Sequence, residues 1–290
     1  MADEDPLTAS IVSSLLHSPI PGDSEEDRHP WARSSTVDIE KPLLRTWDKC
    51  SGSKPTQQNT MLSRLPRQRL DTSELRRGLL SIHAKHKNWT ATPFISFTQS
   101  SRKLQEVADF RSTRPGRGPQ TITVINPNVR IANRLPILDM GLEMRYYGVP
   151  DPYNQSNTYY EDHYICLWEV TEPEIVGHWS WNELKRNILW FDQIVLPAFE
   201  KHNEESSRQR TSVESFDLSA LLGTLPDGAG QGISNASSSP SCASSANWDT
   251  GSEGCELDCK DQYDSYDSYD EVVENNTTDD MFKILEGDWD

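Results

Sequence analysis

The sequence predicts one α+β domain over residues 41–200, between two acidic tails. Short segments with strand character alternate with helical segments, and long polar loops separate them. This arrangement favours an α+β fold over a doubly wound parallel sheet. The apolar and aromatic residues are concentrated between Leu43 and Phe199, so we expect a single hydrophobic core there.

The two tails are predicted from composition. Only 34% of the 290 residues are hydrophobic, and the formal net charge is −17. Residues 1–40 and 201–290 are rich in polar and acidic residues, and such segments bury too little apolar surface to offset chain entropy. We therefore expect both to be disordered. Residues 279–290 place apolar groups among acids, a pattern that can fold as a short helix on a protein partner.

Strand segments are identified by their β-branched and aromatic residues. The predicted strands are Leu43–Trp47, Phe94–Thr98, Thr121–Ile125, Tyr164–Val170 and Glu174–Trp179. A long Tyr-, Pro- and Asn-rich connection is expected between Gly141 and Tyr160.

Two helices are indicated by capping residues followed by apolar residues at helical spacing. The first follows Asp71 and Glu74, presents Leu75, Leu79, Ile82 and His86 on one face, and is expected to end near Lys87. The second begins near Ser100 or Ser101, and its inner face is predicted to comprise Leu104, Val107, Ala108 and Arg111. A later apolar stripe of Trp181, Leu184, Ile188, Phe191 and Val195 is predicted to pack in the core.

Charge is unevenly distributed along the chain. Residues 41–130 hold 17 basic and 5 acidic residues, whereas residues 249–290 hold 2 basic and 15 acidic residues. A basic half-domain suggests an anionic partner, such as a phosphate-bearing small molecule, a nucleic acid or the chain's own tail. The acidic total and the absence of a base-reading motif make a nucleic acid the weakest of these alternatives.

The sequence also argues against several classes. Five cysteines, most of them in the low-complexity tail, do not form a disulfide framework, and Cys255 and Cys259 lack partner ligands for a metal site. There is no apolar run of about 18 residues, so no membrane span is expected. The acidic start is unlike a secretory signal, which places the protein in the cytoplasm or nucleus. Glycine-rich phosphate loops and nucleophile elbows are absent, so dehydrogenase, kinase and hydrolase functions have no support.

Several of these segments, taken in order, resemble a known family. Leu44–Asp48 looks like the first-strand motif of ADP-ribosyltransferases of the cholera and heat-labile enterotoxin type. Phe94–Ser100 resembles the second motif, in which a strand leads into a helix. Glu161–His163, followed by Ile175–Trp179, resembles the end of the catalytic core. An uncharacterised fungal family of intracellular domains has the same layout. The resemblance covers about Pro42–Leu184 and implies a split mixed β-sheet with flanking helices.

The resemblance also implies a NAD site. Arg45 would hold the dinucleotide phosphates, Ser96 would orient the sugar, and Thr98 would lie on the same cofactor-binding strand. Cleavage of the bond to nicotinamide builds positive charge on the ribose, which a carboxylate stabilises. An ungapped alignment places the essential glutamate position on His163, whereas a shift of two residues makes Glu161 the catalytic group.

Three functions therefore follow from the sequence. The first is an ADP-ribosyltransferase-like domain, active or degenerate, that binds NAD or a related nucleotide. The second is a non-enzymatic interaction protein that uses its acidic C-terminal tail. The third is a nucleic-acid binder that uses the basic stretch 64–117. The first requires Arg45, Ser96 and either Glu161 or His163 to line one cleft.

Overall fold

The computed structural model describes residues 6–20, 24–32, 39–85, 90–152 and 160–222, with side chains as far as residue 210. Most of the C-terminal tail, including the apolar residues within 279–290, therefore lies outside the described residues.

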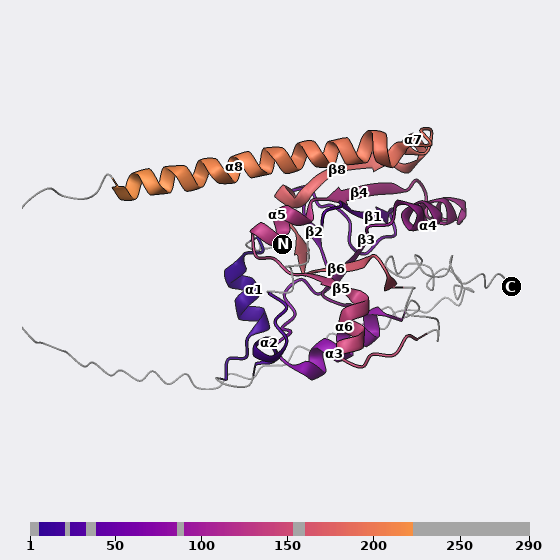
Figure 1. Cartoon of the computed structure of the whole chain (residues 1–290). Coiled ribbons are helices and arrows are strands. Elements are labelled where there is room, and N and C mark those ends of the chain that lie inside the picture. The colour runs from indigo at the N-terminus through magenta and orange to yellow at the C-terminus, as the bar shows by residue number, and fades with distance from the viewer. Residues whose placement is uncertain (1–5, 21–23, 33–38, 86–89, 153–159, 223–290) are drawn as a thin grey trace, which may run out of the picture. The chain divides into compact units, whose positions relative to one another are not determined.

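A six-stranded sheet forms the centre of the domain, in the order β5-β6-β3-β1-β4-β8, and β2 pairs with β7 separately (Figure 1). The strands are β1 (Leu43–Trp47), β2 (Met61–Leu62), β3 (Phe94–Thr98), β4 (Thr121–Ile125), β5 (Ile137–Asp139), β6 (His163–Leu167), β7 (Glu169–Val170) and β8 (Ile175–Ser180). All pairings between these strands are antiparallel. The expected mixed sheet is therefore wrong, because strand direction depends on the route of the connections and not on the strand's own residues.

Helices flank this sheet, as the α+β class requires. They are α1 (Ala9–Leu16), α2 (Glu25–Arg28), α3 (Ser73–His83), α4 (Ser101–Thr113), α5 (Pro127–Ala132), α6 (Met140–Tyr146), α7 (Trp181–Leu184) and α8 (Leu196–Leu222). A 3₁₀ turn at Glu172–Glu174 and a π-helix at Phe191–Val195 complete the elements. The connection expected at 141–160 thus begins with a helix, α6.

Strand prediction succeeded where propensity was strongest. The structure confirms Leu43–Trp47, Phe94–Thr98 and Thr121–Ile125 at both ends. The single strand expected over 164–170 is instead divided between β6 and β7, because Trp168 has a left-handed φ of 61°. Its backbone NH still donates to the Pro93 carbonyl beside β3, and beyond this point the chain pairs with β2 as β7.

The two predicted helices differ in how well their inner faces were assigned. In α4 the buried residues are the four predicted. In α3 the buried face consists of Arg76, Leu80 and His83, whereas Leu75 is exposed. The prediction was wrong for Leu75, whereas Leu79 is half-buried and packs against the core, and His86 lies outside the described residues. Apolar spacing does not reveal an inner position that is occupied by an arginine.

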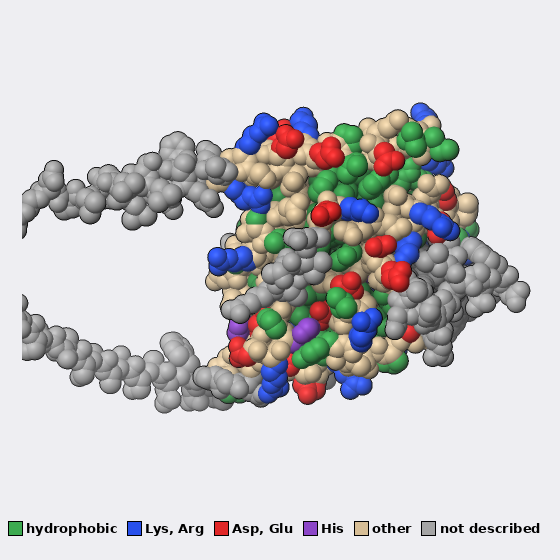
Figure 2. All heavy atoms as spheres, viewed as in Figure 1, with side chains coloured by type: hydrophobic (Ala, Val, Ile, Leu, Met, Phe, Trp, Pro, Cys, Tyr) green, Lys and Arg blue, Asp and Glu red, His purple; other side chains and the backbone are tan. Residues whose placement is uncertain are grey.

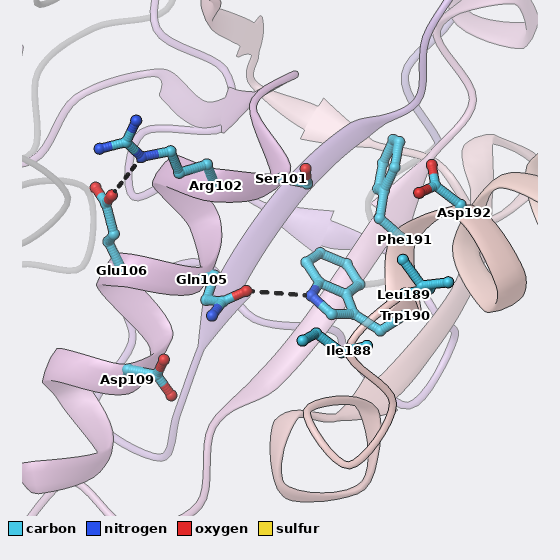
Figure 3. Close-up of a pocket in the computed structure, with 10 residues that line it drawn as sticks. All are labelled: Ser101, Arg102, Gln105, Glu106, Asp109, Ile188, Leu189, Trp190, Phe191 and Asp192. Atoms are coloured by element: carbon cyan, nitrogen blue, oxygen red, sulfur yellow. Dashed lines mark hydrogen bonds and ion pairs between the residues drawn. The ribbon is translucent and has the colours of Figure 1, made fainter.

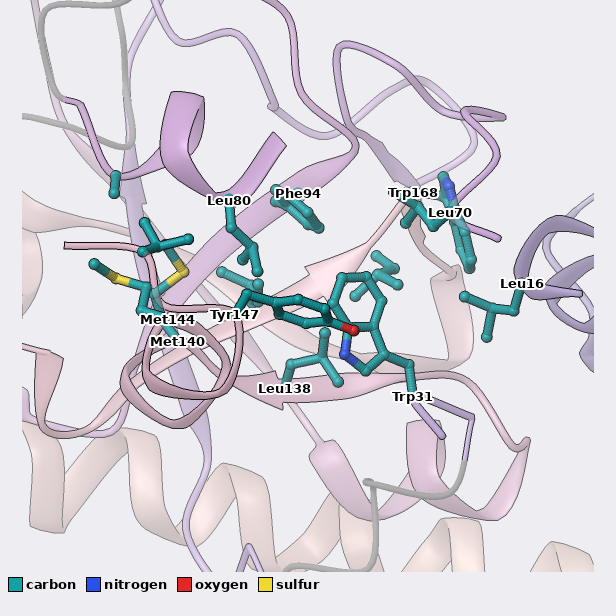
Figure 4. Close-up of a cluster of buried hydrophobic side chains, with 14 of the residues drawn as sticks. Leu16, Trp31, Leu70, Leu80, Phe94, Leu138, Met140, Met144, Tyr147 and Trp168 are labelled. Carbon is teal, nitrogen blue, oxygen red and sulfur yellow. The ribbon is translucent and has the colours of Figure 1, made fainter. Parts of the chain in front are cut away.

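The sheet has two covered faces. On one, which we call face A, Leu44, Ile122 and Val124 pack against Leu104 of α4, and Phe94 packs in the neighbouring core cluster drawn in Figure 4. On the other, face B, the core side chains are Leu43, Ile95, Phe97, Ile125, Ile137 and Cys166. The strict alternation of side chains along each strand separates these two groups.

The expectation that residues 1–40 are disordered is wrong for the described part of that segment. Leu7, Val12, Leu15, Leu16 and Trp31 are buried in the face A core. The sequence pattern missed this because polar residues supply much of the attachment.

Glu26 forms a 2.7 Å ion pair with the buried Arg76, and the Trp31 Nε1–H donates to Glu143 at 2.7 Å. The Arg76 guanidinium also lies 4.3 Å from the centre of the Trp31 ring. Each buried charge therefore has a partner, which offsets the cost of taking it out of water.

The expected disordered tail from residue 201 is also partly wrong, because α8 continues to Leu222. Within the part whose side chains are described, Asn126 donates to His202 at 3.2 Å and to Asn203 at 3.3 Å. These contacts attach α8, near residues 202 and 203, to Asn126, which is the N-cap of α5.

Arg130 of α5 connects several segments that lie later in the sequence. It is fully buried and donates to Glu174 at 2.8 Å. It also donates to the backbone carbonyls of Pro136, Leu167 and Glu169 at 2.8, 2.9 and 2.7 Å. Burial lowers the pKa of Arg130, but the charge of Glu174, the hydrogen bond to it and the nearby Cys166 and Glu169 together outweigh burial, and the net shift is upward. One guanidinium thus links α5 to the last residue of β6 and to the first residue of β7.

We predict that Trp31→Ala lowers the free energy of unfolding by about 3–5 kcal/mol, because a large buried ring is lost and a cavity remains. Urea denaturation measures this. The control Ile20→Ala alters an exposed residue of the same segment and should change stability by less than about 0.5 kcal/mol. Equal effects of the two changes would show that the N-terminal segment is not part of the core.

We also predict that Arg130→Met destabilises the domain by about 3–5 kcal/mol, because Glu174 is left charged and buried. Lys201→Met breaks a pair at 3.9 Å whose side chains are 77% and 56% exposed, and it should cost no more than about 0.5 kcal/mol. Urea denaturation midpoints of the two variants and of the wild type measure both losses of stability. A small effect of Arg130→Met would contradict the assigned role of this ion pair.

Candidate functional site

The positions of the predicted NAD-site residues are determined by strand register. Leu44 pairs with Thr98, and Thr98 pairs with His163. Directly paired residues point to the same side of a sheet, so Thr98 and His163 lie on face A with Leu44. Ser96, two residues from Thr98, shares that face, whereas Arg45 points to face B.

Arg45 is buried among backbone acceptors. Its side chain is only 3% exposed. Its Nη1 donates to the carbonyl of Ser96 at 2.9 Å, and its Nε donates to the carbonyl of Ser53 at 3.4 Å. The guanidinium therefore ties β1 to β3 and to the loop after β1, and it meets the backbone of Ser96 but not its hydroxyl.

Ser96 belongs to a buried chain of polar side chains on face A. Its Oγ lies 2.9 Å from Nε2 of His83, and Nδ1 of the same ring lies 2.9 Å from Oγ1 of Thr92. His83 also makes an edge contact with Phe94, with ring centroids 5.2 Å apart. Sequence reasoning missed His83, although its spacing from Arg76 and Leu80 is helical. This series of hydrogen bonds holds α3 against β3.

Thr98 has a local structural role. It is fully buried, and its Oγ1 accepts a 3.0 Å hydrogen bond from the backbone NH of Ser100. Ser100 in turn is the N-cap of α4. The hydroxyl of Thr98 therefore shapes the turn from β3 into α4.

His163 is a neutral, buried imidazole. Burial, together with the positive charges of Lys103 and Arg45, lowers its pKa to about 3. Its ring lies roughly parallel to that of Tyr160, with centroids 6.0 Å apart. A neutral ring cannot stabilise positive charge on a sugar as a carboxylate does, so His163 is unsuited to the catalytic role.

Glu161 lies in the turn before β6, and its side chain is exposed. Its backbone carbonyl accepts from Lys103 Nζ at 2.6 Å. The structure therefore brings Ser96, Thr98 and His163 to face A, but it places Arg45 on face B and Glu161 outside the core. These residues do not line a single cleft.

Other reactive groups are few in the part of the chain that the structure describes. No group of three or more potential metal-ligating side chains occurs among those residues. Cys166 is buried, and burial raises the pKa of its thiol to about 12. A thiol with so high a pKa remains protonated and is a poor nucleophile.

A surface hollow lies instead between α4 and residues 188–192, with a volume of about 470 Å³ (Figure 3). Ile188 is 93% exposed and Leu189 is 48% exposed, whereas Trp190 is buried. The predicted core position of Ile188 is therefore wrong. Four consecutive apolar residues, 188–191, cannot all share one face of a short helical segment, and this was the sequence signal for exposure.

The comparisons with known proteins add no relative. Neither a scan against family models nor a search of curated proteins finds a match to this chain. Among the described residues, no helix is both long and apolar enough to cross a membrane.

The burial of His163 predicts acid sensitivity. Between its ordinary pKa of 6.5 and its folded pKa of about 3, the unfolded chain binds the proton more readily, so stability falls as the pH falls through this window. His163→Leu should therefore give a flatter dependence of the unfolding free energy on pH. Denaturation across this range measures it, with the exposed His17→Leu as control. An unchanged slope would contradict the buried, neutral state of His163.

Proposed function

We propose that this chain is a non-enzymatic protein-interaction module. The observation that carries this proposal is the separation of the residues that NAD chemistry would need. Arg45 and Ser96 point to opposite faces of the sheet, and both are buried in intramolecular contacts. An active site requires its groups to converge on one reacting atom. The surface hollow, whose largely polar lining includes the exposed Ile188 and Leu189, is better suited to contact with another protein.

The C-terminal sequence supports the same proposal. Residues 249–290 hold 2 basic and 15 acidic residues, with Phe282, Leu285 and Trp289 among the last of them. Acidic segments with isolated apolar residues can bind by ordering on a partner, and the charge accelerates encounter with a basic surface.

A second candidate function retains the ADP-ribosyltransferase resemblance. The strands that carry its motifs, β6, β3 and β1, are consecutive neighbours in the sheet. The Arg45 guanidinium also touches the backbone of the second motif at Ser96. These features support an ADP-ribosyltransferase-like fold, degenerate in its catalytic residues, that binds NAD or a related nucleotide.

The two candidates are separated by NAD chemistry. On the interaction proposal, we expect neither the wild-type chain nor His163→Glu to release nicotinamide from NAD, because no carboxylate meets a dinucleotide site. Chromatographic detection of nicotinamide and calorimetric titration with NAD measure this. Cleavage by the wild type that is lost in Glu161→Gln would overturn the interaction proposal, and cleavage gained in His163→Glu would indicate a degenerate enzyme.

The role of the tail is tested separately. Deletion of residues 249–290 should reduce the amount of partner protein that is captured by chemical cross-linking to the chain. The reason is that the acidic segment no longer attracts the partner. Thermal unfolding of the same variant should be unchanged, which would show that the domain remains folded. If the shortened chain captures as much partner protein as the full chain, the tail does not take part in the interaction.

A further inference from the structure

The walls of the hollow come from two elements that are far apart in sequence. Ser101, Arg102, Gln105, Glu106 and Asp109 of α4 form one side, and residues 188–192 form the other. In Figure 2, hydrophobic side chains lie beside acidic ones near the α7 end of the molecule. The hollow therefore combines apolar contact surface with charge.

Trp190, at the base of the hollow, is fixed by a hydrogen bond and by packing against a second indole ring. The Trp190 Nε1–H donates to Gln105 at 3.4 Å, as Figure 3 shows, and the Trp181 Nε1–H donates to Asp109 at 2.7 Å. The two indole rings meet edge to face with centroids 5.6 Å apart. Because both are buried in the core with Leu104, a ligand would meet a preformed surface.

The backbone at this rim is unusual. Residues Phe191–Val195 form a π-helix, which the buried Trp190 separates from the exposed Ile188 and Leu189. Such irregular turns are uncommon in helices and frequently occur at functional sites. Here the π-helix follows the exposed pair and leads into α8, which begins at Leu196.

The charge of the hollow selects among occupants. Its lining contains Glu106, Asp109 and Asp192 against the single cation Arg102, a net charge of −2. Arg102 is already paired with Glu106 at 2.9 Å. Lys185 belongs to the neighbouring hollow on the other side of Asp109. The apolar pair 188–189 is thus bordered by negative charge.

Two occupants from this chain itself are disfavoured. The segment 279–290 carries five acids and one lysine, so it would bring like charge to the hollow. A second copy of the chain carries a net charge of −17 and is repelled by the first. A basic segment of a different protein satisfies both the apolar and the charged parts of the surface.

We infer that the hollow between α4 and residues 188–192 docks a basic peptide segment of another protein, with an aliphatic or aromatic anchor seated against Ile188 and Leu189. This inference deepens the interaction function proposed above and rests on it.

The direct test uses the full chain and defined peptides. Fluorescence anisotropy compares an amphipathic peptide of Leu and Arg with a Leu and Glu counterpart and with an Arg peptide that lacks Leu. Ile188→Asp should weaken the Leu and Arg peptide about tenfold or more, since loss of a central anchor contact has this effect. The matched control Leu142→Asp alters a residue of α6 that is 51% exposed and should leave the affinity unchanged.

The control variant also isolates the hollow from the acidic tail, because the tail is identical in all these chains and attracts any basic peptide equally. Equal loss of affinity in Ile188→Asp and Leu142→Asp, or equal binding of the acidic counterpart, would overturn the inference. Circular dichroism confirms that each variant is folded before its affinity is compared.

A second experiment identifies the natural occupant. The photoreactive residue p-benzoylphenylalanine replaces Ile188 in the full chain, and mass spectrometry locates the cross-linked peptide. We expect cross-links to segments in which Lys or Arg flank an apolar residue. Cross-links to residues 279–290, or to a second copy of the chain, would overturn the inference.

Chemical cross-linking of the wild type and of Ile188→Asp to their partners separates failure of the inference from failure of the proposed function. If partners are captured equally by the wild type and by Ile188→Asp, the docking surface is wrong and the interaction function stands. If no partner is captured and the chain cleaves NAD, the interaction function itself is wrong.

Discussion

The strict alternation of side chains in the antiparallel sheet is the constraint on which the rest of this structure depends. Pairing of Leu44 with Thr98 fixes the face of every neighbouring side chain in β1 and β3. Arg45 is thereby placed with Phe97 on face B, and Ser96 is placed on face A with His83. The Arg45 guanidinium reaches the backbone carbonyl of Ser96, but the two side chains lie on opposite faces of the sheet. A site that needs both side chains cannot form without a change of register.

Buried charged side chains join segments of the domain that are distant in sequence. Arg76, Arg111 and Arg130 are all fully buried. Arg76 attaches the N-terminal segment through Glu26, and Arg111 donates to the carbonyl of Thr46 at 3.3 Å. Arginine suits this task because its fork of donors can satisfy several acceptors at once. The basic residues of the first half of the domain therefore serve partly as internal connectors, and an anionic ligand is not required to explain them.

The proposed interaction function would use two features with the same sign of charge. The hollow has an acidic lining around exposed apolar residues, and the C-terminal sequence is strongly acidic. A basic partner with an apolar anchor would be attracted by both, one through long-range charge and the other through close contact. The hollow supplies rigid shape, because Trp190 is fixed from below by hydrogen bonding and edge-to-face packing.

The sequence by itself determined the α+β class, three strands and the inner face of α4, because propensity and helical spacing are local properties that these segments satisfy strongly. Tertiary structure decided what depends on partners distant in sequence. It placed parts of segments 6–20 and 24–32 in the core, exposed Ile188, and directed the Arg45 side chain to the face opposite that of Ser96. Strand order, register and buried ion pairs arise only when separate segments meet, and no single segment encodes its partner.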